Sequence, residues 1–133
     1  MHTIVVGYDG SEPADRALER ATKLIDGGGT VVLVSAIHML AGKGGMGYDP
    51  IEKGDFDRQL YAAKARLADV GITATTVEGT GDPARVITAQ AEEIDADLIV
   101  VGNGHKNLLE RLLFGSVSAG VSHRTNCDVL VVD

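Results

Sequence analysis

The chain has 133 residues, a formal net charge of −7 and a hydrophobic fraction of 44%, the size and composition of one globular domain. Its acidic balance and its aromatic content of only 4% argue against a nucleic-acid partner, because a phosphate backbone requires a basic face and bases stack on aromatic rings. One cysteine excludes an intrachain disulfide, and no apolar run approaches the roughly 20 residues that cross a bilayer. We expect one cytoplasmic domain over residues 1–133 that binds neither nucleic acid nor membrane.

Five short runs rich in β-branched residues predict the strands. Four of them are continuously apolar rather than alternating, the pattern of strands that are covered on both faces of a parallel sheet. The third run is more polar, which favours an edge position. The five predicted strands are Thr3–Tyr8, Thr30–Ile37, Ile72–Glu78, Asp97–Gly102 and Asp128–Val132.

Helical periodicity fills the intervals between these strands. Apolar residues recur at a spacing of three or four after Ser11, a natural N-cap, and Gly27 closes that segment. The pattern returns from Phe56 to Val70, before a glycine. It returns again after Asp82-Pro83, which is typical of an N-cap followed by proline at the first helical position.

A last helix is expected to begin near Gly115-Ser116, with Val117 and Val121 on its inner face. Strands that alternate with helices imply right-handed crossovers. We therefore predict an α/β fold with a doubly wound, five-stranded parallel sheet in the order 3-2-1-4-5 and helices on both faces. The glycine-rich stretch His38–Asp55 is predicted to be a mobile surface loop, either a lid over a ligand or an insertion without a role.

In such a sheet, ligands bind beyond the carboxyl ends of the strands, where the strand order reverses. The first strand is followed by Gly7-Tyr8-Asp9-Gly10-Ser11, the fourth by a glycine-rich turn at residues 102–107, and Gly115-Ser116-Val117-Ser118 opens the last helix. Glycines beside a helix start let backbone N–H groups approach a phosphate. The competing interpretation, commoner for such a motif in isolation, is that the glycines serve turns and Ser116 caps a helix.

Other classes of site do not fit. Residues 102–107 read G-x-G-x-x-N, which lacks the third glycine of the dinucleotide signature, and no P-loop motif occurs. A phosphoacceptor receiver domain would need an acidic cluster after the first strand, where Asp9 stands alone, and a lysine after the fifth. The histidines have no metal-ligand spacing, so we expect no dedicated metal site. Cys127 is predicted to be a packed side chain rather than a reactive thiol.

Several segments in chain order resemble the universal stress protein family. Val5–Ser11 resembles its opening motif, Gly79–Ala84 the start of its third helix, and Ala96–Gly102 its fourth strand. Gly115–Ser118 and Cys127–Val132 resemble its closing helix and strand. The resemblance implies a stress-response sensor or regulator that binds ATP or AMP, with Mg²⁺ held through the phosphates and at most slow hydrolysis.

The nucleotide-binding branch of that family carries G-x-x-G, nine residues, then G-[ST]. Gly102 and Gly115-Ser116 match this signature, but the second glycine position holds His105, with Gly104 one residue early. We expect the His105 side chain to hinder the terminal phosphates, so that His105→Gly tightens ATP more than AMP. The resemblance implies that Asp9 holds the ribose hydroxyls and that the backbone of Ala36 reads the adenine. The full implied set is Gly7, Asp9, Ala36, Val101, Gly102, Gly104, His105, Gly115, Ser116 and Val117.

The last strand, Asp128–Val132, is too apolar to remain an unpaired edge in water. The resemblance implies that two such strands pair antiparallel across a twofold axis and form a homodimer. Two alternatives stay open: a nucleotide-free dimeric interaction protein of the same fold, in which the glycines are only structural, and a cyclic-nucleotide or AMP binder, because a smaller anion is less affected by His105.

Overall fold

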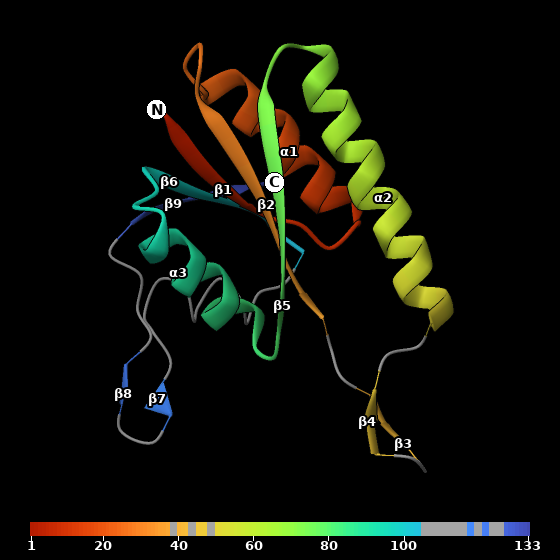
Figure 1. The fold of residues 1–133 in the computed structure, drawn as a ribbon. Coiled ribbons are helices and arrows are strands. Elements are labelled where there is room, and N and C mark those ends of the chain that lie inside the picture. Colours follow the sequence, from red (N-terminus) through yellow and green to blue (C-terminus); the bar gives the residue numbers. More distant parts are fainter. Residues whose placement is uncertain (38–39, 43–44, 48–49, 105–116, 119–120, 123–126) are drawn as a thin grey trace.

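The computed structural model describes residues 1–37, 40–42, 45–47, 50–104, 117–118, 121–122 and 127–133. Its centre is a five-stranded, all-parallel sheet in the order β5-β2-β1-β6-β9 (Figure 1). This confirms the predicted order 3-2-1-4-5, with the polar third strand at one edge and the last strand at the other. The strands are β1 (Thr3–Gly7), β2 (Thr30–Ile37), β5 (Thr73–Thr80), β6 (Leu98–Gly102) and β9 (Asp128–Val132).

Strand β1 lies in the middle of the sheet, and its residues Ile4, Val5 and Val6 are fully buried. It pairs in parallel with β2, from Thr3 opposite Thr30 to Gly7 opposite Val34, and with β6 on its other side. The Tyr8 N–H continues this ladder with a 2.9 Å hydrogen bond to the Val34 carbonyl oxygen. The carboxyl end of β1 is therefore held between β2 and β6.

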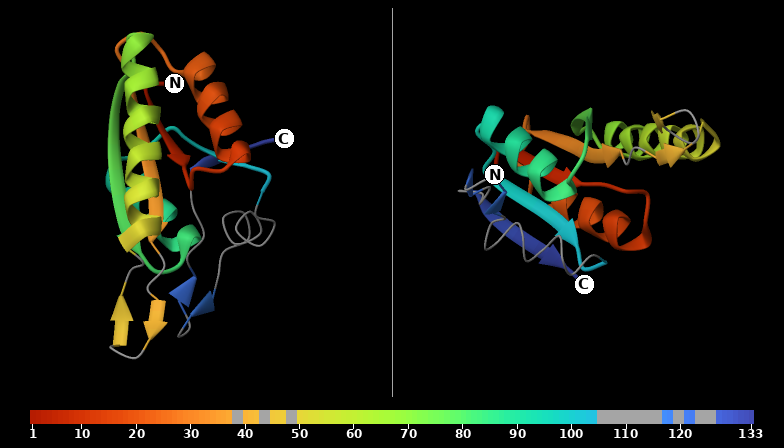
Figure 2. Two further views of the ribbon diagram at one scale, coloured as in Figure 1. Left: turned by 90° about the vertical axis from the view of Figure 1, so that its right-hand side faces the viewer. Right: turned by 90° about the horizontal axis from the view of Figure 1, so that it is seen from below.

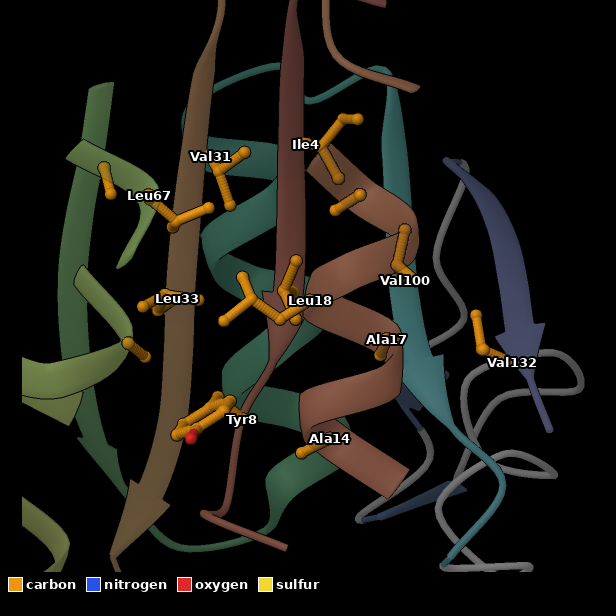
Figure 3. Packing of buried hydrophobic residues seen from close by; sticks show 14 of the residues in the cluster. Ile4, Tyr8, Ala14, Ala17, Leu18, Val31, Leu33, Leu67, Val100 and Val132 are labelled. Atoms are coloured by element: carbon orange, nitrogen blue, oxygen red, sulfur yellow. The ribbon is translucent and has the colours of Figure 1, made fainter. Parts of the chain in front are cut away.

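Helices cover both faces of the sheet, as predicted. Helices α1 (Glu12–Leu24) and α2 (Pro50–Asp69) cover one face, and α3 (Pro83–Glu93) covers the other (Figures 1 and 2). Alternate residues of the central strands supply two separate cores. The α1 and α2 side contains Ile4, Leu18 and Leu33 (Figure 3), and the α3 side contains Val5 and Ile87.

Helix α1 begins where the sequence predicts it to begin. Ser11 is its N-cap, and the Ser11 hydroxyl oxygen accepts a 3.3 Å hydrogen bond from the Ala14 N–H. Acidic residues in the first turn and Lys23 in the last turn complement the helix dipole. The small side chains of Ala14, Ala17 and Ala21 are buried and let the helix lie close to the sheet.

The segment predicted as an irregular loop over residues 38–55 is different in the structure. Within its described residues, β3 (Leu40–Gly42) pairs antiparallel with β4 (Gly45–Gly47), and α2 already begins at Pro50. Proline is well suited to the first turn of a helix, where its missing N–H has no intrahelical partner. The apolar repeat of α2 starts only at Phe56, so the hydrophobic pattern does not indicate that the helix begins at Pro50.

The prediction of a helix that begins near residue 115 is also wrong for the residues that the structure describes. Val117–Ser118 forms β7, which pairs antiparallel with β8 (Val121–Ser122). Valine and serine are weak helix formers, and Gly120 weakens a helix further, so local preference favours a short hairpin. Both hairpins lie at the end of the molecule toward which the parallel strands point (Figure 1). In the described part of the chain, no helix combines the length and the apolar character needed to cross a membrane.

Candidate functional site

The described candidate residues lie together at the carboxyl ends of three adjacent strands. Asp9 follows β1, Ala36 lies near the end of β2, and Gly104 follows β6. Gly7, Val101 and Gly102 end β1 and β6. The predicted residues His105, Gly115 and Ser116 lie outside the described residues, and the backbone of Val117 belongs to β7.

The Asp9 carboxylate is anchored to the start of α1. Its Oδ1 atom accepts a 2.9 Å hydrogen bond from the Ser11 N–H and a second, short one from the Ser11 hydroxyl. Gly10, between them, has a φ of 80°, the left-handed region that favours glycine. The turn after β1 therefore presents an exposed carboxylate in a defined place.

A residue of α2 reaches the same turn. The side-chain amide carbon of Gln59 lies 2.9 Å from where a Cβ on Gly10 would stand, so the Gln59 carboxamide covers this glycine. Gln59 is absent from the predicted site because nothing in the helical pattern distinguishes it from other polar surface positions. Only the packing of α2 beside the turn shows that it borders the candidate site.

The glycines that end the central strands have packing partners of their own. A Cβ on Gly7 would stand 2.9 Å from Ile87 Cδ1 of α3 and 3.1 Å from Val101 Cγ1. A Cβ on Gly102 would collide with the backbone of Pro13 and stand 2.7 Å from its Cβ. Gly102 is therefore required by helix–sheet packing, because a Cβ there would meet backbone, whereas a Cβ on Gly7 would meet the ends of side chains that can shift.

The turn after β6 is tied to the end of β9. The Asn103 N–H donates a 2.9 Å hydrogen bond to the Val132 carbonyl oxygen, and Asn103 Nδ2 donates one of 2.6 Å to Asp133 Oδ1. Gly104 then passes over α1, where its Cβ position is 3.1 Å from Pro13 Cγ. These contacts hold the predicted phosphate-binding turn against both β9 and α1.

Tyr8 lies beneath the Asp9 turn, at the carboxyl end of the core on the α1 side (Figure 3). Its hydroxyl donates a 2.8 Å hydrogen bond to Asp15 Oδ1, which also accepts one of 3.1 Å from Arg66 Nη2. Burial, and then the hydrogen bond to Asp15, raise the pKa of Tyr8 to about 12. At neutral pH the phenol is protonated, and this network joins the turn after β1 to α1 and α2 below the site.

Cys127 has the surroundings of a packed thiol. It is half-buried beside the α3-side core, and its Sγ donates a 3.2 Å hydrogen bond to the Ala96 carbonyl oxygen. Burial raises the pKa of the Cys127 thiol, which keeps it protonated at neutral pH. Among the described residues, no cluster of histidine, cysteine and acidic side chains is arranged to hold a metal ion.

Known proteins match this chain over its whole length. The model of the universal stress protein family matches residues 1–133. A universal stress protein of Mycobacterium tuberculosis is 34% identical, over 98% of this chain and 94% of the relative. A crystal structure from Burkholderia pseudomallei superposes with a TM-score of 0.75 at 30% identity, over 98% and 94% of the two chains. A universal stress protein in complex with cAMP superposes with a TM-score of 0.67 at 31% identity, over 99% and 96%.

Proposed function

Because this chain belongs to the universal stress protein family, we propose that it binds an adenine nucleotide at the carboxyl ends of β1, β2 and β6 and acts as a sensor or regulator in a stress response. The observation that carries the proposal is the Asp9 carboxylate, held by Ser11 at the topological switch point of the sheet. A carboxylate there is suited to accept hydrogen bonds from the vicinal hydroxyls of a ribose.

The proposed contacts to the other parts of the ligand are those that the family resemblance implies. In this proposal the backbone of Ala36, two residues beyond the last β1–β2 pair, meets the adenine edge. The turn after Gly102, together with Gly115, Ser116 and Val117, supplies N–H groups for the phosphates, with Mg²⁺ bound through phosphate oxygens. In this proposal the protein binds ATP or AMP and hydrolyses ATP slowly if at all.

A cyclic nucleotide is the second candidate ligand, because a structural relative 31% identical to this chain was crystallised with cAMP. Its single phosphate demands less space beside His105 than a triphosphate. A nucleotide-free interaction protein is the third candidate, because the packing of the Pro13 backbone against Gly102 accounts for that glycine without a ligand.

Two measurements separate these candidates. Mass spectrometry of small molecules released from the denatured, purified protein identifies a co-purified nucleotide. Calorimetric titration with ATP, AMP and cAMP then compares the wild type with Asp9→Ala. We expect the affinity of this variant to be lower by a factor of about ten or more, the effect of losing one hydrogen bond to a charged group. Asp69→Ala, at the exposed carboxyl end of α2, is the matched control and should bind as the wild type does. A wild-type protein that binds none of the three nucleotides would contradict the proposal.

We also propose that the protein is a homodimer formed through β9. Among the described residues this strand pairs only with β6, because it ends the sheet. Its apolar residues Val129, Leu130 and Val131 are half-buried rather than covered. An apolar edge strand of this kind is a ready partner for a second copy of itself.

A further inference from the structure

Ser11 makes more contacts than capping a helix requires. As the N-cap of α1, its hydroxyl oxygen accepts the 3.3 Å hydrogen bond from the Ala14 N–H. The same hydroxyl donates to Asp9 Oδ1, and the Ser11 N–H donates to that oxygen at 2.9 Å. The carboxylate oxygen of Asp9 thus has two donors from one residue, and that residue is fixed in turn by α1.

From this geometry we infer that Ser11 is a positioning residue for the ribose, which acts by holding the Asp9 carboxylate in the orientation that meets the sugar hydroxyls. The inference rests on the proposed nucleotide site. Asp9 is exposed, and an exposed aspartate exchanges between side-chain rotamers unless something holds it. Two hydrogen bonds to one oxygen restrict that rotation before a ligand arrives, and such preorganisation lowers the entropic cost of binding.

The backbone contributes to the same arrangement. Gly10 has a φ of 80°, and this turn brings the Ser11 N–H back toward the Asp9 side chain. The N–H remains in every substitution at position 11 except proline, whereas the hydroxyl donor is lost in Ser11→Ala. Loss of the hydroxyl is therefore expected to loosen Asp9 without releasing it, and to weaken binding less than loss of Asp9 itself.

The experiment compares ATP with 2′,3′-dideoxy-ATP, which lacks the hydroxyls that Asp9 would hold. Calorimetric titrations of both ligands are made with the wild type, Asp9→Ala, Ser11→Ala, Ser11→Thr and Ser11→Asp. Threonine keeps the hydroxyl donor and the cap. Aspartate is as good an N-cap as serine but has no side-chain donor for Asp9 at neutral pH, so it separates the two roles.

We expect the wild type to bind ATP more tightly than the dideoxy ligand. Ser11→Ala should reduce that ratio of affinities by about fivefold, which is less than the loss of one full hydrogen bond to a charged group would cause. Ser11→Thr should retain the preference, while Ser11→Asp should lose it although thermal unfolding shows an intact helix cap. In the Asp9→Ala background, Ser11→Ala should cause no further loss of the preference.

Three results would overturn the inference. Equal weakening of both ligands by Ser11→Ala, with no change in their ratio, would leave Ser11 as a helix cap only. A wild type that binds both ligands equally well would show that Asp9 does not hold the ribose, although nucleotide binding would stand. A wild type that binds neither ligand would remove the proposed function and this inference with it.

Discussion

The backbone carbonyl group of Pro13, in the first turn of α1, occupies the place where a Cβ atom on Gly102 would stand. This contact joins the start of the first helix to the end of the fourth strand of the sheet. Since the obstacle is backbone and not a flexible side chain, it cannot move aside cheaply.

We therefore expect Gly102→Ala to destabilise the fold by about 1–3 kcal/mol, the usual cost of overpacking. Urea unfolding measures the change. The matched control is Gly27→Ala, whose Cβ would have no heavy atom within 4 Å and which we expect to be neutral or slightly stabilising. Equal stability of the two variants would contradict the packing role of Gly102. A loss of nucleotide binding in Gly102→Ala is therefore evidence about the ligand only after correction for this loss of stability.

The Tyr8 phenol should make folding stability depend on pH in the alkaline range. Its pKa is raised from an ordinary value of 10.0 to about 12, so protonated Tyr8 stabilises the fold fully below pH 10.0, and that contribution is lost as the pH rises through about 12. In Tyr8→Phe the alkaline loss of stability should be smaller, and at neutral pH the variant should be about 1 kcal/mol less stable because the hydrogen bond to Asp15 is missing.

Near-ultraviolet absorbance during an alkaline titration provides a direct check on Tyr8. The chain has three tyrosines, and Tyr61 is 78% exposed. We expect a late tyrosine ionisation near pH 12 in the wild type that is absent from Tyr8→Phe. Titration of every tyrosine near pH 10.0 would show that the phenol is not held as described.

Asp97 should contribute stability at neutral pH that acid removes. Hydrogen bonds from the backbone N–H of Thr3, at 2.9 Å, and of His2, at 2.8 Å, lower the pKa of this carboxyl. A carboxyl whose pKa is lowered on folding stabilises the protein above its unfolded pKa, and the contribution is lost as the pH falls through the folded value. We expect Asp97→Asn to be less stable than the wild type at neutral pH and equal to it in strong acid.

Chemical unfolding across the acidic range tests this dependence on Asp97. Glu93→Gln, an exposed position in the last turn of α3, provides the comparison and should show a smaller difference at neutral pH. A constant difference between Asp97→Asn and the wild type at every pH would mean that the carboxylate charge is not what Thr3 and His2 stabilise.

A proline at position 131 should weaken the proposed dimer without unfolding the subunit. The Val132 carbonyl oxygen accepts from Asn103, on the β6 side of β9. Because the N–H and C=O groups of successive residues point alternately to the two sides of a strand, the Val131 N–H points to the open edge. Val131→Pro removes a donor from that edge only.

Light scattering at micromolar concentration should show a dimer for the wild type and a larger monomer fraction for Val131→Pro. Leu130→Pro is the internal control, since its N–H faces β6 and its loss should lower the thermal stability of the subunit itself. A wild-type protein that is monomeric under these conditions would contradict the dimer proposal.

The sequence by itself determined the architecture wherever the signal is local. The continuous apolar runs Val31–Val34 and Leu98–Val101 predicted buried parallel strands. A strand whose sheet is covered on both faces carries apolar side chains on both, so its sequence does not alternate between apolar and polar residues. Ser11 marked the start of α1, because an N-cap acts within its own turn. The resemblance to known motifs then led to the same family that the whole chain matches.

Only the tertiary structure decided which residues border the site and why. Gln59 covers Gly10 from a helix that no local pattern connects to that turn. Gly102 reads from sequence as a phosphate-binding glycine, and the fold adds that Pro13 leaves no room for a side chain there. Tyr8, directly after β1, and Arg66 of α2 both bind Asp15 of α1. Contacts between residues distant in the chain depend on the angle and depth at which each helix packs on the sheet, and spacing along the sequence carries no record of that geometry.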